Sequence, residues 1–551
     1  MATELDRRFD ETLAAVTGLG GRLVIGSDEQ GRAIVTNLPP TLPGLFRAFS
    51  ELNSDKEAVV AGEERLTFAD LDRISERVAH GLIERGIAKG DRVGIAMRNC
   101  PAWIVSYMGI VKAGAVATLL NGWWEPLEME HAVLLSDPKL IIADPARAKR
   151  LSARCGDRDI LSLPIELPVE QAVTELLGTG DGELPEVSPE DDATILFTSG
   201  STGESKGAVS THRAVTTATY AYATGLMVLL GILTTEGRAP SAQPRTLLSV
   251  PLFHVTGEVP VMINSFVIGR CMVIMHKWDA TEALRLIEKE KITYFVGVPT
   301  MSLELMNHPD RGKYDLSSLT DITAGGAPRP ITHVERLREE FPNAQPALGY
   351  GLTETNAAGC ANYWGNYAAK PASTGRAQKP FIDLAILGAG DRHLAVGEVG
   401  EIAIRSASNI RSYWRNPEAT KALFTDDGYI RTGDVGYVDE DGYLFIVDRK
   451  KEIIIRGGEN ISAAEVEAEC YACPDVAEIA VFGAPDERLG EVPIAVVHTK
   501  NGLSEQDLRS FLEERIAKFK IPARFIFSAE PLPRLGTGKI DRRALKAQYA
   551  S

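Results

Sequence analysis

The feature that most constrains the fold of this chain is a regular alternation of helical and strand-like patterns between Thr67 and Leu352. Thr67 and Asp70 form the signature of a helix capping box, and apolar residues then recur at helical spacing at Leu71, Ile74, Val78 and Leu82. Further on, the helical stretch TEALRLIEKEK leads directly into the strand-like ITYFVGVP. Because such alternation is typical of doubly wound, mainly parallel sheets, we expect an α/β fold with ligand sites at the carboxyl ends of the strands.

The pattern changes after Gly375, where the helical stretches give way to short runs of alternating apolar and polar residues. Asp-Gly pairs interrupt these runs at Asp427-Gly428 and Asp441-Gly442. Because Asp-Gly is a preferred sequence for tight turns between antiparallel strands, the two pairs predict hairpins in a β-rich subdomain.

A second change comes at the charged cluster DRKKE, which begins at Asp448. A compact α/β pattern follows, in which Ser504 and Asp507 are expected to cap a helix. We therefore predict a large N-terminal domain over residues 1–448, with doubly wound sheets plus the β-rich subdomain. Residues 449–551 are predicted to form a small separate C-terminal α+β domain.

Charge and composition limit the partners of the protein. Its 551 residues carry a formal net charge of −16 at pH 7, which argues against wholesale binding to nucleic acid or to an anionic membrane. The amino-terminal MATELDRRFDETLAAV lacks the apolar stretch of a secretory signal, and six scattered cysteines fit a reducing compartment. We therefore expect a cytoplasmic protein with no nucleic acid partner, and assembly into a homodimer stays open.

Two further features have simple structural interpretations. The uncharged stretch from Ala214 to Thr235 is long enough to cross a bilayer, but six of its residues are threonine and it lies between two motifs that must share one site. We expect a buried helix, or one that lines an apolar tunnel, and no integral membrane span. Cys470 and Cys473 form a CxxC pair, but no second pair completes a four-thiolate zinc site, so we expect two ordinary cysteines.

A loop rich in serine and glycine is the first candidate for a binding site. The apolar run from Ile195 to Phe197 is expected to be a buried strand, and TSGSTGESKG follows it from Thr198 to Gly207. Freed backbone N–H groups, hydroxyls and the charge of Lys206 suit a polyphosphate. The P-loop of kinases does not fit, because it requires Gly where Ser205 stands and Ser or Thr at Gly207. On these residues alone, a solvated polar loop stays open as an alternative.

Several spaced motifs occur in order along the chain and together narrow the interpretation. They are TSGSTGESKG, PLFH (Pro251 to His254), AGGAP (Ala324 to Pro328), YGLTET (Tyr350 to Thr355), GEIAIR (Gly400 to Arg405), RTGD (Arg431 to Asp434), DRKKEIIIRGGENIS (Asp448 to Ser462) and PRLGTGKI (Pro533 to Ile540). Over nearly the whole chain this set resembles the adenylate-forming superfamily, in particular its acyl-CoA synthetase branch. The resemblance implies a ligase that activates a carboxylic acid with ATP as acyl-AMP, releases pyrophosphate, and passes the acyl group to CoA.

The resemblance also implies a set of nucleotide-binding residues. Lys539 in TGKI matches the adenylation lysine, whose charge is needed because two anions must approach each other at the α-phosphate. Tyr350 would stack on adenine, Asp434 would hold the ribose hydroxyls with help from Arg449, and the serine-rich loop would hold the β- and γ-phosphates. The complete set implied for ATP and AMP is Thr198, Ser199, Gly200, Ser201, Thr202, Gly203, Lys206, Gly326, Ala327, Pro328, Tyr350, Gly351, Thr353, Asp434, Ile446, Arg449 and Lys539.

Further roles follow from the same resemblance. Glu354 would bind Mg²⁺ with Thr198, since hard cations prefer oxygen ligands, and these two residues join Lys539 and His254 in the expected catalytic set. Lys451 stands at the hinge position about which the small domain would swing. CoA is expected at Arg456, Gly457 and Gly458, where missing side chains leave room for a pantetheine arm. The acyl pocket is expected to include His254, Val255, Gly325, Gly349 and Gly351, with His254 acting as a gate more than a base.

The sequence departs from the common pattern of the superfamily at three positions. Ser205 stands where Pro is usual, Ser406 follows GEIAIR where Gly is commoner, and Arg411 occupies a position that is frequently apolar. None of these changes removes a charged or catalytic group.

The identity of the acid and of the acyl acceptor is less constrained. PLFHVTG, IIIRGGENIS and LLNGWW resemble the fatty acyl-CoA synthetase branch most, so we expect a fatty or other apolar acid, with an aryl acid such as a cinnamate as the alternative. A second hypothesis is an adenylation enzyme that loads a carrier protein or activates an amino acid. EVPVMINSF has no Asp for a substrate ammonium, although Glu258 leaves an opening. A third is a non-catalytic nucleotide-binding paralogue, against which the intact motif set argues.

Overall fold

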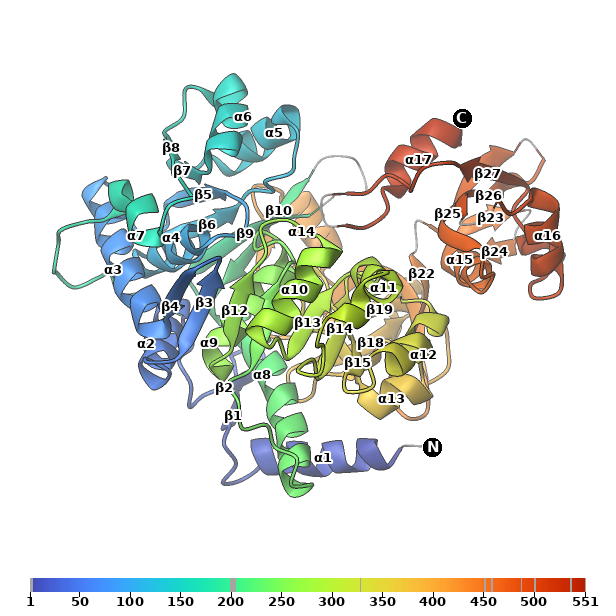
Figure 1. Cartoon of the computed structure of the whole chain (residues 1–551), viewed down its shortest axis with the longest axis horizontal. Helices are drawn as coiled ribbons and strands as arrows, with labels where there is room; N and C mark the ends of the chain where they lie inside the picture. Colours follow the sequence, from blue (N-terminus) through green and yellow to red (C-terminus); the bar gives the residue numbers. More distant parts are fainter. Residues whose placement is uncertain are drawn as a thin grey trace.

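The computed structural model describes residues 3–198, 205–327, 329–449, 452–456, 459–486, 488–499, 502–535 and 538–550. Figure 1 shows a large body built on two sheets and, beside it, a smaller C-terminal unit that contains α15 to α17. The expected α/β fold is confirmed. The boundary after residue 448 and the mobility of the small domain stay predictions.

The first large sheet has seven strands and carries the strand that precedes the serine-rich loop. Its order is β20 (Ser412–Tyr413), β10 (Lys206–Thr211), β9 (Asp192–Thr198), β6 (Val116–Leu119), β5 (Arg92–Ala96), β7 (Leu140–Ala143) and β8 (Ile160–Ser162). The strands from β9 to β8 are parallel, whereas β10 pairs antiparallel with both β9 and β20. Ile195 and Leu196 are buried in β9, as the apolar run predicts.

The second large sheet has thirteen strands and joins the parallel core to the β-rich part. Its order is β18 (Asp383–Leu387), β19 (Gly400–Arg405), β21 (Ile430–Val438), β22 (Tyr443–Arg449), β17 (Gly375–Ala377), β16 (Cys360–Tyr363), β15 (Gln345–Tyr350), β14 (Asp321–Gly325), β13 (Tyr294–Gly297), β11 (Arg245–Leu248), β12 (Cys271–Ile274), β3 (Glu57–Ala61) and β4 (Glu64–Thr67). The run from β15 to β3 is parallel, and the pairs from β16 to β18 are antiparallel.

One of the two predicted hairpins forms as expected. Asp441-Gly442 connects the antiparallel strands β21 and β22. At Asp427-Gly428 the chain also turns, but only a single antiparallel bridge, between Phe424 and Ile430, flanks the turn. The turn itself forms, but the expected pair of strands does not, because the residues before it form helix α14 (Pro417–Leu423) instead of a strand.

Helices cover the sheets on both faces, as doubly wound folds require. Besides α14, they are α1 (Glu4–Thr17), α2 (Leu42–Leu52), α3 (Phe68–Glu84), α4 (Pro101–Lys112), α5 (Pro126–Ser136), α6 (Pro145–Cys155), α7 (Val169–Ala172), α8 (His212–Thr235), α9 (Asn264–Ile268), α10 (Ala280–Glu290), α11 (Pro299–Asn307), α12 (Ile331–Glu340) and α13 (Trp364–Ala369). The capping box at the start of α3 is confirmed, since Thr67 accepts from the Asp70 backbone and Asp70 from that of Thr67.

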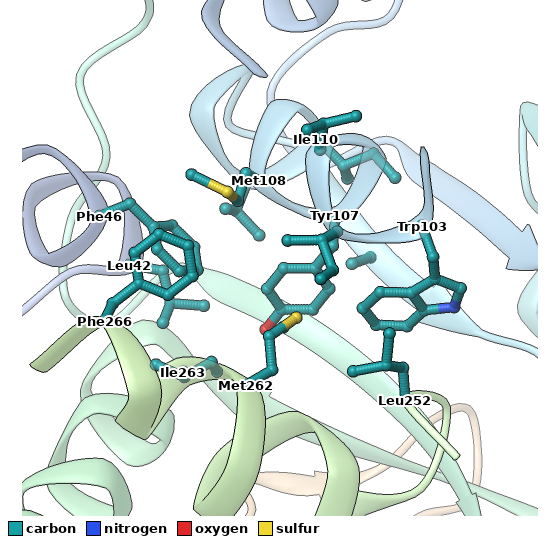
Figure 2. Packing of buried hydrophobic residues seen from close by; sticks show 14 of the residues in the cluster. Leu42, Phe46, Trp103, Tyr107, Met108, Ile110, Leu252, Met262, Ile263 and Phe266 are labelled. Carbon is teal, nitrogen blue, oxygen red and sulfur yellow. The ribbon is translucent and has the colours of Figure 1, made fainter. Parts of the chain in front are cut away.

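A buried aromatic cluster fills the space between α2, α4 and the π-helical turn Gly257–Ile263 (Figure 2). Phe46 packs edge-on against Phe266 at a ring-centroid distance of 4.8 Å, and Trp103 stacks on Tyr107 at 5.4 Å. The Tyr107 hydroxyl donates to Glu258 Oε1 at 2.7 Å. Glu258 is fully buried in this core, and burial raises the pKa of its carboxyl to about 8.

Helix α8 contains the uncharged stretch that raised the question of a membrane span. Among the described residues, α8 is the one helix that is long and apolar enough to cross a bilayer. However, 72% of its most apolar 18-residue stretch is buried inside the protein. Two of its buried threonines are satisfied within the helix, because Thr219 and Thr224 donate to carbonyls four residues earlier. The prediction of a buried helix is confirmed.

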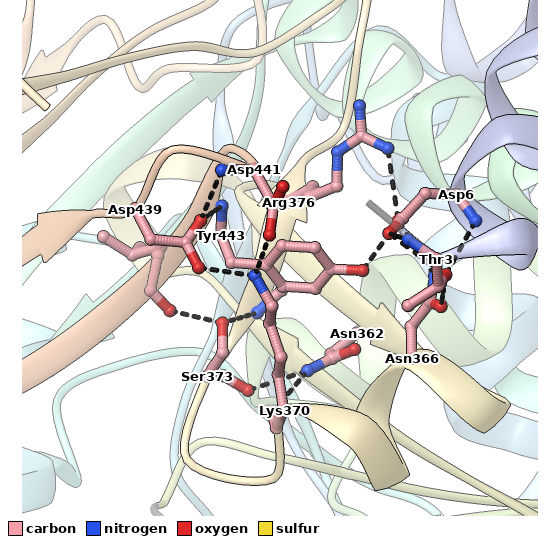
Figure 3. Close-up of polar contacts among 12 residues, drawn as sticks. Thr3, Asp6, Asn362, Asn366, Lys370, Ser373, Arg376, Asp439, Asp441 and Tyr443 are labelled. Atoms are coloured by element: carbon pink, nitrogen blue, oxygen red, sulfur yellow. Dashed lines mark hydrogen bonds and ion pairs between the residues drawn. The ribbon is translucent and has the colours of Figure 1, made fainter. Parts of the chain in front are cut away.

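The N-terminal helix α1 is tied to the β-rich part by Asp6, which is 2% exposed (Figure 3). Its carboxylate accepts from the Tyr443 hydroxyl at 2.7 Å, from Asn366 at 3.0 Å and from Arg376 at 3.3 Å. Beside it, Lys370 contacts the two aspartates of the turn between β21 and β22, Asp439 and Asp441. This network braces the hairpin that carries Asp434 and Arg449.

The C-terminal unit is a five-stranded sheet with three helices. Its strands are β24 (Glu459–Ile461), β23 (Ile454–Arg456), β26 (Gly490–Thr499), β25 (Val476–Asp486) and β27 (Arg524–Ser528), and its helices are α15 (Ala463–Tyr471), α16 (Glu505–Glu513) and α17 (Arg542–Tyr549). Ser504 caps α16 by accepting from the Asp507 backbone, as predicted. Cys470 and Cys473 are buried free thiols. A separate two-stranded ribbon pairs β1 (Ile25–Ser27) with β2 (Ala33–Val35).

Candidate active site

A cavity of about 3380 Å³ lies where the carboxyl ends of the parallel strands face the C-terminal unit. It brings together residues that are far apart in the sequence. Those predicted from the motifs that line it are Thr198, Lys206, His254, Val255, Gly325, Gly326, Ala327, Gly349, Tyr350, Gly351, Thr353, Glu354, Asp434, Ile446, Arg449 and Lys539. One cavity thus brings together the described members of the sets predicted for the nucleotide, the acyl group and catalysis.

Some predicted residues lie elsewhere or outside the described ranges. Arg456 lies in β23, where its guanidinium donates to the Phe519 carbonyl at 3.1 Å, and it does not line the cavity. Outside the described residues lie Ser199, Gly200, Ser201, Thr202, Gly203, Pro328, Lys451, Gly457 and Gly458. Their roles stay predictions.

Lys539 reaches the cavity from a turn of the C-terminal unit. The turn is closed by the Leu535 N–H, which donates to the Lys539 carbonyl at 2.7 Å. Gly538 has φ +80° and lies against the large body, since a Cβ there would be 3.2 Å from Val298 Cγ2. A Cβ built on Gly326 would lie 3.3 Å from Lys539 Nζ, so the amine stands directly over the AGGAP loop. Enclosure, with the nearby charge of Arg449, lowers the pKa of Lys539 to about 8.

Asp434 lines the same cavity and is 4% exposed. Its position follows from β21 and β22, in which Asp434 and Arg449 are register partners. Asp434 Oδ1 is 3.0 Å from Arg449 Nε, and Oδ2 accepts from the Tyr350 hydroxyl at 2.7 Å. Burial raises the pKa of Asp434, although Arg449 and Tyr350 act against that shift. The carboxylate is therefore held in one orientation by two donors.

Glu354 belongs to a polar chain that the motifs did not reveal. Its Oε1 accepts from the Tyr413 hydroxyl at 2.7 Å, and the Lys206 ammonium lies 4.9 Å from the centre of the Tyr413 ring. Tyr413 comes to the site because the two-residue strand β20 pairs with β10. Tyr413 is a functional candidate that the sequence reasoning missed, and SYW directly after Arg411 carries no local signal for this contact.

The departure at Arg411 has a structural reason. Its guanidinium is 2.6 Å from Asp192 Oδ1, at the start of the strand that ends in Thr198. The unusual arginine therefore pairs with a carboxylate on the same sheet and lies away from the cavity.

His254 lines the cavity close enough to Lys539 to sense the charge of its amine. Its Nδ1 accepts from the Thr256 N–H at 3.3 Å, which leaves Nε2 as the protonated nitrogen of the neutral ring. Burial, together with the positive charge of Lys539, lowers the pKa of His254 to about 3. A neutral imidazole with such a low pKa is a poor general base, which agrees with the gate expected from the sequence.

The floor of the deeper part is bare backbone. Gly325 and Gly349 are register partners on β14 and β15, and a Cβ added to Gly349 would meet nothing within 4 Å. Glu258, the residue that left the amino-acid hypothesis open, does not line the cavity. It faces the aromatic core and binds Tyr107 instead.

Comparisons with known proteins agree with this site. The model of the AMP-binding enzyme family matches residues 46–414, and that of the AMP-binding enzyme C-terminal domain matches residues 465–539. The long-chain-fatty-acid–CoA ligase FadD13 of Mycobacterium tuberculosis is 34% identical, over 88% of this chain and 94% of the relative. The feruloyl-CoA synthase of an Amycolatopsis species is also 34% identical, over 89% of this chain and 96% of the relative.

Among solved structures, ATP-bound MatB from Rhodopseudomonas palustris superposes with a TM-score of 0.81 at 27% identity, over 92% of this chain and 99% of that one. Fold and site together define an adenylate-forming enzyme of the acyl-CoA synthetase branch, which is an AMP-forming acid–thiol ligase. The chain belongs to the AMP-binding enzyme family.

Proposed function

We propose that this ligase activates an apolar carboxylic acid with ATP, releases pyrophosphate, and transfers the acyl group from the acyl-adenylate to CoA. The observation that carries the proposal is the position of Lys539, whose amine stands over Gly326 in the cavity that also holds Asp434 and Glu354. An amine in that place faces both the nucleotide wall and the path of an incoming carboxylate.

The nucleotide is proposed to lie between the AGGAP loop and the Asp434 wall. Tyr350 would stack on adenine while its hydroxyl stays bound to Asp434, whose carboxylate would accept from the ribose hydroxyls. Gly326 and Ala327 would supply backbone groups to the adenine edge, and Ile446 an apolar contact. Arg449 holds Asp434 in place and adds positive charge on the ribose side.

Lys539 is proposed to perform the electrostatic part of adenylation. As the carboxylate oxygen attacks the α-phosphorus, negative charge grows on the phosphoryl oxygens, and a cation already aimed at them stabilises the transition state. The leaving group is pyrophosphate, which Lys206 and the serine-rich loop would hold. Since the pKa of Lys539 is about 8, the amine is mostly a cation at neutral pH.

The oxygen donors of Glu354 and Thr198 suit a magnesium site. Glu354 and the Thr198 hydroxyl line the same cavity, and one carboxylate oxygen of Glu354 is oriented by Tyr413. Mg²⁺ bound there would neutralise charge on the triphosphate, and two protein oxygens suit an ion that keeps several waters. Thr353 beside Glu354 would contact phosphate.

The second half-reaction requires the small domain to move. We propose that the chain swings at Lys451, withdraws Lys539 and presents Arg456, Gly457 and Gly458 to CoA. This is consistent with the position of Arg456 on the C-terminal unit, outside the cavity, while Lys539 is inserted. The neutral His254 would then gate the passage between the acyl pocket and the thiol.

Two observations favour an apolar acid and CoA over the carrier-protein alternative. The relatives are named for fatty and aromatic acids, and their names all include CoA. In addition, an amino-acid substrate would need a carboxylate to bind its ammonium group. Glu258, the candidate for that role, does not line the cavity and accepts from Tyr107 in the core instead.

A screen of pyrophosphate release tests the proposal. Saturated fatty acids, cinnamic acids and amino acids are each supplied with ATP and Mg²⁺, with and without CoA, and AMP and thioester are measured in parallel. We expect release that depends on an apolar acid and thioester that depends on CoA. Release that depends on no acid would overturn the proposal, and omission of Mg²⁺ with excess EDTA should abolish the signal. Light scattering on the purified protein and fractionation of cells test the homodimer and the cytoplasmic location.

A further inference from the structure

The deep part of the cavity follows the face of the large sheet in rows of side chains. Parallel register places Val296 beside Thr323, and Gly325 beside Gly349 one row nearer the Lys539 amine. Because alternate residues of a strand share a face, the row on the far side of Val296 begins with Tyr294. Of these residues, Gly325, Gly349, Val296, Thr323 and Tyr294 all line the cavity.

Along β13, β14 and β15, the cavity lining on this face ends at the row of Tyr294. The deepest lining residue of this face is Thr323 on β14 and Gly349 on β15, whereas Asp321 and Gln345, the row partners of Tyr294, do not contribute. The Asp321 carboxylate is instead bound by the Trp364 indole N–H at 3.0 Å. The path from the glycine floor therefore meets the Tyr294 side chain and goes no further along the sheet.

Tyr294 is held from behind by a buried arginine. The Arg270 guanidinium lies 4.8 Å from the centre of the Tyr294 ring, and Arg270 is 2% exposed. It donates to Ser265 Oγ at 2.9 Å and to the carbonyls of Pro260 and Val261 at 2.9 and 3.1 Å. A ring stacked on a guanidinium that makes these three hydrogen bonds cannot swing backward without displacing it, so this end wall resists movement.

Helix α8 forms the opposite wall with an aromatic residue as well. Tyr222 lines the cavity, and its hydroxyl donates to the Ala357 carbonyl at 2.5 Å. One turn further, a Cβ on Gly225 would lie 2.8 Å from the Tyr363 hydroxyl, so the helix and β16 are in close contact there. The space left for an acyl group is therefore a slot between α8 and the sheet.

We infer that Tyr294, backed by Arg270, is the residue that sets the acyl length, and that the acid is compact: a medium-chain aliphatic acid or a single substituted ring. The inference rests on the proposed function and deepens it. Four residues separate the Gly325 row from the Tyr294 row, which is about 13 Å at about 3.3 Å per residue. At about 1.25 Å of advance for each tetrahedral carbon, a chain of roughly ten carbons fills that length.

The test is a chain-length series of saturated acids from C4 to C18, with cinnamic acids as the ring-shaped arm, measured by acid-dependent pyrophosphate release. For the wild-type enzyme we expect kcat/KM to peak by about C10 and to fall by about tenfold or more at C16, since extra methylenes forced into a closed site are strongly disfavoured. Tyr294→Ala should raise kcat/KM for C14 and C16 relative to C8 by about tenfold, whereas Tyr294→Phe, which keeps the ring, should keep the wild-type profile.

Two further variants make the result interpretable. Tyr294→Leu keeps apolar packing against Arg270, and it should shift the profile toward longer acids even if Tyr294→Ala does not fold. Tyr314→Ala removes a tyrosine that does not line the cavity, and it should leave the profile unchanged. A wild-type enzyme that uses C16 as well as C8, or an unchanged profile in both shortened Tyr294 variants, overturns the inference but not the proposed function. Failure to activate any acid would instead overturn the proposed function.

Discussion

The two halves of the cavity are built from different materials. The half that we propose for the nucleotide is made of charged and hydroxyl side chains that hold one another, such as Asp434 between Tyr350 and Arg449. The half that we propose for the acyl group is made of bare backbone at Gly325 and Gly349 and of aromatic side chains at Tyr222 and Tyr294. Polar groups recognise a ligand that never changes, whereas shape selects a ligand that differs among relatives. The predictions below test this division.

The largest effect is expected on the side of the nucleotide, from Lys539→Ala. Loss of one preorganised cation should slow acyl-adenylate formation by about 10²- to 10³-fold. Thioester formation from supplied acyl-adenylate and CoA should stay largely intact, because Lys539 is proposed to leave the site before that step. Single-turnover assays of each half-reaction measure both effects.

Lys518→Ala is a matched control, since it removes an exposed lysine of the same unit that does not line the cavity. It should leave both half-reactions unchanged. If Lys539→Ala slowed both half-reactions equally, it would contradict the proposal that the small domain swings and withdraws Lys539 before thioester formation.

The next largest effect is expected from Asp434→Asn. The amide keeps the shape of the side chain but removes the charge that binds Arg449 and would bind the ribose. Hydrogen bonds to charged groups contribute about 1.5–3 kcal/mol, so kcat/KM for ATP should fall by about 10- to 100-fold. Steady-state kinetics with ATP and acid varied separately should show no comparable change in KM for the acid. If KM for the acid changed as much as KM for ATP, the assignment of the two substrates to separate halves of the cavity would be contradicted.

The pH dependence of adenylation should report the Lys539 amine. Its pKa is lowered to about 8, so the cation is about nine-tenths formed at pH 7, about half formed near pH 8 and lost above it. The rate of the first half-reaction should therefore be level below about pH 7, fall to about half near pH 8, and then fall by up to about tenfold per pH unit. Stopped-flow measurements between pH 6.5 and 10 check the slope. A rate that stays level to pH 10 would show that the amine has its ordinary pKa.

The smallest effect is expected in the acyl half, from a pair of glycine variants. A Cβ at Gly349 meets nothing within 4 Å, so Gly349→Ala should fold normally and project a methyl group into the slot. We expect KM for the acid to rise by about five- to tenfold, on the scale of overpacking, with KM for ATP unchanged.

Gly351→Ala is the contrasting control. A Cβ there would lie 2.0 Å from the Ala357 carbonyl oxygen, so this variant should lower the melting temperature, while Gly349→Ala should not. If Gly349→Ala raises KM for ATP instead, the glycine floor belongs to the nucleotide half.

The sequence predicted those parts of the fold that depend on short spacing. The capping box at Thr67, the N-cap at Ser504 and the turn at Asp441-Gly442 appear as expected, because each involves residues at most a few positions apart. The turn at Asp427-Gly428 shows the limit of such signals. There the same dipeptide follows a helix, and the only strand-like pairing recorded beside the turn is the bridge between Phe424 and Ile430.

For the candidate site, most of the described residues that the motifs named do line the cavity, but the motifs did not name their partners. Tyr413 joins Glu354 only through the pairing of β20 with β10, and Arg411 is explained only by its contact with Asp192. Asp6 likewise reaches Tyr443 from the other end of the chain. No local pattern encodes contacts between segments so far apart, because they depend on how whole sheets and helices pack.

By itself, the sequence determined the class of fold and the chemistry proposed for the nucleotide half. Both depend on residue types at fixed short spacings, which can be recognised without the structure. Only the tertiary structure decided how the acyl half ends. Tyr294, Arg270 and Tyr222 come from three separate elements, and their meeting is a matter of shape and packing. Side-chain chemistry can be read in order along the chain, but the volume of a cavity exists only after distant segments have come together.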